Sequence, residues 1–110
     1  MRNYPDGYRF IKIGEGSDTV LKLFRSYDEG FVIAEEWMLN SGCTAIIPRE
    51  PGIYAVCGYS GSIHVIRKEQ GHLNSYTSSV LRSIVKKLEE GGVDVKEISL
   101  EDAVRILEEW

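Results

Sequence analysis

The residues best suited to chemistry in this chain are a cysteine and a histidine in the stretch AVCGYSGSIHV, residues 55–65. Ser60 and Gly61 are turn-forming residues at its centre, and a two-residue hairpin loop there places Cys57 opposite His64. Directly opposed residues of antiparallel strands project to the same face, with Cβ atoms about 5 Å apart. This register predicts contact between the Cys57 thiol and the His64 imidazole.

A third candidate, Cys43, depends on the connection PREPG, residues 48–52. If all of PREPG forms the loop, Cys43 stands opposite Cys57 and joins it in a row with His64. If a tight turn centres on the Pro-Gly pair instead, the register shifts by an odd number and Cys43 projects to the other face. The sequence leaves both registers open.

Three interpretations of this row compete. In the first it is core, because free cysteine is among the most buried residue types and the neighbouring Ala45, Ala55 and Ile66 are apolar. In the second, Cys57 is the nucleophile and His64 the base of a thiol-dependent hydrolase or transferase. In the third, Cys43, Cys57 and His64 bind zinc. Nothing in the sequence places a carboxylate beside His64 or completes a zinc site, so core packing is favoured over catalysis, and no cofactor is expected.

Composition favours a single globular domain, residues 1–110, in the cytoplasm. No apolar run approaches the roughly 20 residues needed to cross a bilayer, and the N-terminus lacks the apolar segment of a signal peptide. The two cysteines are too few for a disulfide framework. A net charge of −4 and a pI near 5.2 argue against nucleic acid as a partner.

The elements that must position these residues indicate an α+β fold. Apolar residues at i, i+3, i+4 and i+7 predict a helix over 18–28, and similar stripes predict helices over 75–90 and 99–109. Residues 31–40 fit either a strand or a helix. The β-rich runs around Cys43, Cys57 and His64 predict a three-stranded antiparallel meander, with short strands near 8–13 and 93–98. The favoured template is ferredoxin-like, β-α-β-β-α-β, with additions.

A weaker motif supports an alternative function. Gly14 and Gly16 in GEGSDT match two glycines of a phosphate-binding fingerprint between a strand and a helix, and Lys86 belongs to a basic stripe on the helix 75–90. A nucleotide or nucleic-acid binder is therefore one alternative, although a turn and a helix cap explain the same residues.

The meander also predicts an association surface. One of its faces carries the cysteine and histidine row, and the other carries Ile46, Tyr54, Val56, Ile63 and Val65. Both faces are largely apolar, and helices on one side only would leave the other exposed, so the sequence predicts either a homodimer through the sheet or helices on both of its sides. The sequence thus favours a non-catalytic binding or regulatory module over an enzyme, acting as a homodimer with a protein or small-molecule partner.

Overall fold

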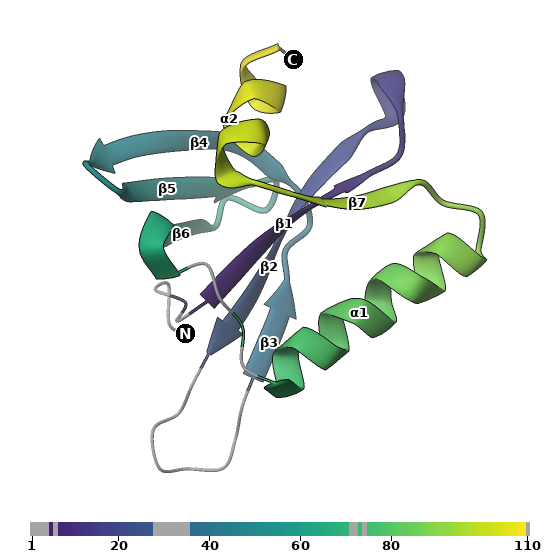
Figure 1. The fold of residues 1–110 in the computed structure, drawn as a ribbon. Coiled ribbons are helices and arrows are strands. Elements are labelled where there is room, and N and C mark those ends of the chain that lie inside the picture. Colours follow the sequence, from purple (N-terminus) through teal and green to yellow (C-terminus); the bar gives the residue numbers. More distant parts are fainter. Residues whose placement is uncertain (1–4, 6, 28–35, 71–72, 74, 110) are drawn as a thin grey trace.

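The strands form two separate antiparallel sheets (Figure 1). The computed structural model describes residues 5, 7–27, 36–70, 73 and 75–109. In spatial order, the four-stranded sheet contains β3 (Glu36–Leu39), β2 (Val20–Tyr27), β1 (Gly7–Ile13) and β7 (Val95–Ile98). The three-stranded sheet contains β4 (Cys43–Glu50), β5 (Ile53–Gly58) and β6 (Ile63–Arg67). The other elements are the helices α1 (Ser75–Glu90) and α2 (Leu100–Glu109) and the short 3-10 turns Gly16–Asp18 and Lys68–Gln70.

Helix α1 covers one face of the four-stranded sheet. Its Leu81 joins Ile11, Phe24 and Val95 in a buried cluster, and the apolar stripe of the helix packs around that cluster. The helix ends where the sequence predicts, at the double glycine, and Gly92 has a φ of +81°, which a residue with a side chain adopts only with strain.

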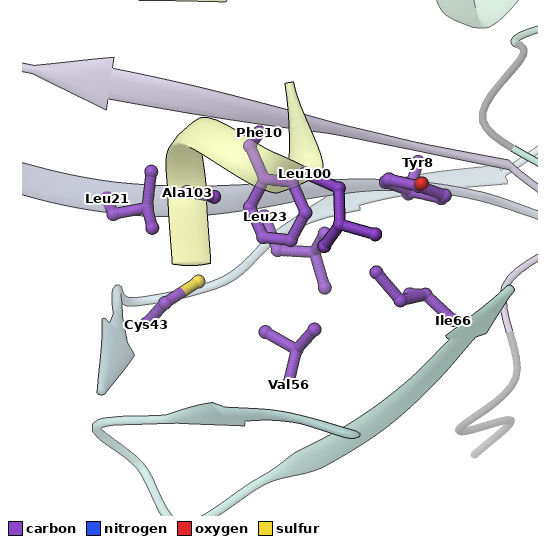
Figure 2. Close-up of a cluster of buried hydrophobic side chains, with 9 residues drawn as sticks. All are labelled: Tyr8, Phe10, Leu21, Leu23, Cys43, Val56, Ile66, Leu100 and Ala103. Atoms are coloured by element: carbon purple, nitrogen blue, oxygen red, sulfur yellow. The ribbon is translucent and has the colours of Figure 1, made fainter. Parts of the chain in front are cut away.

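The three-stranded sheet and α2 cover the opposite face. Figure 2 shows Val56 and Ile66 pointing toward Leu23 of β2 and Leu100 of α2, in a cluster that also contains Phe10. These five side chains are at most 5% exposed, and burial of each contributes roughly 1.5–3 kcal/mol. This cluster packs the two sheets against each other.

The helix predicted over residues 18–28 is wrong, because Val20–Tyr27 forms strand β2. The strand lies between β1 and β3 and is covered on both sides, with Leu23 facing the second sheet and Phe24 facing α1. A strand that is buried on both faces carries apolar residues at odd and even positions, and here they coincide with helical spacing.

The α+β class, the meander and the helices over 75–90 and 99–109 are confirmed. Helix α2 is capped by Ser99, whose Oγ accepts a hydrogen bond of 3.1 Å from the backbone N–H of Asp102. The ferredoxin-like template is not matched, because the strands form two sheets and a strand follows β1 where the template has a helix. Within residues 31–40, 36–39 form a strand, whereas 31–35 lie outside the described residues.

No helix in the described part of the chain is both long enough and apolar enough to span a bilayer.

Candidate functional site

The hairpin between β5 and β6 separates Cys57 from His64. Gly61 has a φ of +85° and ends a three-residue loop, in which the Gly58 N–H donates to the Ser62 carbonyl at 2.9 Å. Three-residue hairpin loops of this kind need one residue with positive φ, which glycine supplies. Cys57 therefore pairs with Ile63, one residue before the predicted partner.

The predicted contact between the thiol and the imidazole is consequently wrong. His64 pairs with Val56 and projects toward the four-stranded sheet, whereas Cys57 projects to the opposite face. The structure does not bring the nominated nucleophile and base together.

Cys43 lies on the face that Cys57 does not occupy. The β4–β5 connection is a tight turn at Pro51 and Gly52, as in the second alternative, but an irregularity between Pro48 and Glu50 returns Ala45 to the position opposite Cys57. A second irregularity, between Cys43 and Ala45, turns Cys43 to the other face, where it pairs with Gly58. The thiol is fully buried, and its sulfur accepts a hydrogen bond of 3.5 Å from Asn40 Nδ2. Burial raises the pKa of Cys43 to about 11, so the group stays a neutral thiol at neutral pH.

The proposed zinc ligands do not converge either. Cys43 and His64 lie on the inner face of the three-stranded sheet and Cys57 lies on the outer face. Among the residues that the structure describes, no group of three His, Cys, Asp or Glu side chains is placed to hold a metal ion.

His64 contacts Arg25, a residue that the sequence argument missed. Arg25 Nη1 lies 2.9 Å from Nε2 and 3.1 Å from Nδ1 of His64, and 3.3 Å from the Tyr27 hydroxyl, to which it donates. His64 is 2% exposed and Arg25 is 4% exposed. Because Arg25 can only donate, the imidazole accepts as the neutral form.

Burial and the nearby guanidinium lower the pKa of His64 to about 4. Among the described residues, Arg25 Nε is buried without a hydrogen-bond partner. If residues 20–27 are taken as a strand, alternation places Arg25 on the same face as Leu23, toward the three-stranded sheet. The prediction of a helix over these residues did not place it there. The pair is a buried polar contact between the sheets and is not exposed to a substrate.

In the part of the chain that the structure describes, the core leaves the outer face of the three-stranded sheet uncovered. We define it by the nine residues that the strand register places on the side away from the four-stranded sheet. They form three rows across β4, β5 and β6: Ala45, Cys57 and Ile63; Ile47, Ala55 and Val65; Glu50, Ile53 and Arg67. None of the nine belongs to either buried cluster in the described part of the chain.

Two of its three rows are entirely apolar. Ile47 is 47% exposed and Ile63 is 53% exposed, whereas the central Ala55 is 4% exposed because larger neighbours flank it. The prediction that both faces of the meander are largely apolar is therefore confirmed, although the hairpin register exchanges the residues of β6 between the faces. In the third row, Glu50 and Arg67 stand on the two edge strands with Ile53 between them.

Described residues line two pockets near the edges of the sheets. One, of about 280 Å³, adjoins the third row and is lined by Ile53, Arg67 and Glu69 together with the Pro51–Gly52 turn. The other, of about 400 Å³, lies between β1, β7 and the start of α2. Its floor is Tyr8, Phe10, Ile98 and Leu100, and its charged lining residues are Arg9, Lys68, Glu97 and Glu101.

Ion pairs close the rim of this larger pocket. Lys68 Nζ lies 3.1 Å from Glu101 Oε1, and Arg9 Nε lies 3.7 Å from Glu97 Oε1. The hydrogen bond between Lys68 and Glu101 raises the pKa of the lysine and lowers the pKa of the glutamate. The four charged groups at the rim therefore sum to zero net charge.

The glycine motif and the basic stripe do not form a phosphate site in this fold. Gly14 and Gly16 lead into a three-residue turn and then into β2, so no helix N-terminus follows them as the fingerprint requires. Lys86 is exposed on α1, on the side of the four-stranded sheet away from β4–β6. The two features thus belong to different parts of the surface.

No protein-family model matches the chain, and neither does any curated protein or solved structure.

Proposed function

We propose that the protein is a small non-catalytic binding module that self-associates through the outer face of β4, β5 and β6. The observation that carries the proposal is the pair of apolar rows on this face, in which Ile47 and Ile63 are about half exposed. Contiguous apolar surface of this kind commonly marks a site of association. A surface with no charge in its centre also suits contact with a copy of itself, because like charges do not oppose each other there.

The size of the face indicates a weak dimer. Three strands about 4.8 Å apart and about six residues long cover roughly 300 Å² per copy, before the surrounding side chains are counted. Stable interfaces bury about 800 Å² per partner, so we expect a dissociation constant of roughly 10–100 µM. Such a dimer forms and separates as the concentration of the protein changes.

The pocket between β1, β7 and α2 supports binding of a small partner molecule by the same module. An apolar floor with a few polar groups at the rim is the usual architecture of a small-ligand site. The two ion pairs at this rim must open or be bridged by a ligand that carries both a donor and an acceptor.

Analytical ultracentrifugation tests self-association directly. The average mass should rise from monomer toward dimer between about 1 µM and about 1 mM. Ile63→Lys should weaken the dimer at least tenfold, because it places an unpaired charge in the apolar rows. Tyr76→Lys is the matched control, since Tyr76 is 51% exposed but lies on α1.

A monomer over the whole range would refute the proposal. Equal weakening by the two substitutions would also count against it, provided that circular dichroism shows both variants folded.

A further inference from the structure

The charged row of the outer face constrains how two copies could meet. This inference rests on the proposed self-association and adds its geometry. Glu50 and Arg67 are exposed, carry opposite charges and stand at opposite edges of the same row. Neither forms an ion pair with another residue that the structure describes.

A two-fold axis parallel to the strands exchanges the edges of the sheet but keeps the order of the rows. In that arrangement β4 of one copy lies over β6 of the other, and Glu50 faces the partner's Arg67. The two-fold symmetry repeats the contact, so two opposite-charge pairs form. Aligned packing of two sheets, at about −30°, is a common geometry for faces of this kind.

The other face-to-face arrangements leave these charges worse placed. An axis that lies in the plane of the sheets and is perpendicular to the strands reverses the order of the rows. Glu50 and Arg67 then lie over apolar residues of the partner, where a charge without an opposite charge is costly. Orthogonal packing about a diagonal axis places like charges together: either Glu50 of one copy lies over Glu50 of the other, or Arg67 lies over Arg67. Only the parallel axis pairs opposite charges, and electrostatic complementarity of this kind fixes the register of an interface.

The apolar rows also fit the parallel axis. Ala45 then faces the partner's Ile63, so a small side chain meets a large one. On the central strand, Ala55 of one copy lies over Ala55 of the other, and Cys57 lies over Cys57. These small residues allow the sheets to approach closely. The two Cys57 thiols come near each other at the axis. At a sheet spacing of about 10 Å, however, the Cα atoms are too far apart for a disulfide.

We infer that two copies pack outer face to outer face about an axis parallel to the strands, with β5 over β5 and Glu50 of each copy paired with Arg67 of the other.

Cross-linking through Cys57 tests the axis with a residue that the chain already provides. At a protein concentration above the dissociation constant, a short bismaleimide should join two copies at Cys57, whereas the fully buried Cys43 should not react. Cys57→Ser should abolish the product. A chain that carries both Cys57→Ser and Tyr76→Cys controls for random collision, because its exposed thiol lies on α1.

A charge swap tests the paired row. At low salt, Glu50→Arg and Arg67→Glu should each weaken the dimer by about tenfold, and the double variant should recover most of that loss. A dimer that neither cross-links at Cys57 nor responds to the swap would refute this axis and leave self-association intact. A monomer in every sample would refute both proposals.

Discussion

Acidification should destabilise the folded chain through His64. The imidazole is buried against the Arg25 guanidinium, so protonation would place two positive charges side by side between the sheets. The unfolded chain binds this proton near pH 6.5, whereas the folded chain resists it until about pH 4. Between these values the unfolded state holds more protons, and the free energy of unfolding therefore falls as the pH falls.

The size of the effect follows from the two pKa values. The difference between 6.5 and about 4 corresponds to about 3 kcal/mol of folding free energy. This contribution should be complete above pH 6.5, be lost progressively toward pH 4 and level off below it. A loss of about 3 kcal/mol is a large part of the stability of a small domain.

Urea unfolding, followed by far-ultraviolet circular dichroism at several pH values, measures this loss. The protein should be kept below about 1 µM, because self-association would add its own stabilisation. His64→Gln is the informative variant, since glutamine can accept a hydrogen bond from Arg25 but does not titrate. The free energy of unfolding of this variant should not show the loss that His64 causes between pH 6.5 and pH 4, whatever its value at neutral pH. Parallel pH profiles for the two proteins would refute this account of His64.

Three further predictions concern the thiols, a buried amide and a helix cap. In the native protein at neutral pH, iodoacetamide should label Cys57 and leave Cys43 unmodified until the chain unfolds, as mass spectrometry of the digested protein would show. Asn40→Ala should cost about 1–3 kcal/mol in urea unfolding, because Asn40 Oδ1 accepts a buried hydrogen bond of 2.8 Å from the Leu23 N–H; an unchanged midpoint would contradict this role. Ser99→Ala should cost about 1 kcal/mol through loss of the α2 cap, and Ser99→Asp should restore most of it.

The sequence predicts those elements whose signals are local. The apolar stripe and the double glycine define α1, and the Ser99 cap defines the start of α2. The turn residues around Pro51 and Gly61 divide the meander into its strands. Each of these signals lies within a few residues of the feature that it predicts, so the tertiary structure does not need to be known.

The sequence misses the features that depend on tertiary packing or on one backbone conformation. Strand β2 looks helical because its apolar residues serve two different layers, the second sheet and α1. The contact of Cys57 with His64 fails because Gly61 closes a three-residue loop, and one added loop residue inverts the faces of a whole strand. The partner of His64, Arg25, is far from it in the chain and becomes recognisable only when β2 is known to be a strand.

Strand β4 has two register irregularities, between Cys43 and Ala45 and between Pro48 and Glu50, and the first has a consequence for how this chain can change in length. Cys43 pairs with Gly58 and Ala45 pairs with Cys57, so Thr44 between them has no opposite residue. Deleting Thr44 would keep every other residue of β4 on its present face, because the strand would lose only its unpaired position. Deleting a paired residue in the middle of β5 would instead invert part of that strand and expose core side chains. Thr44 is therefore a position in the meander where the protein can lose a residue and retain both its core and its outer face.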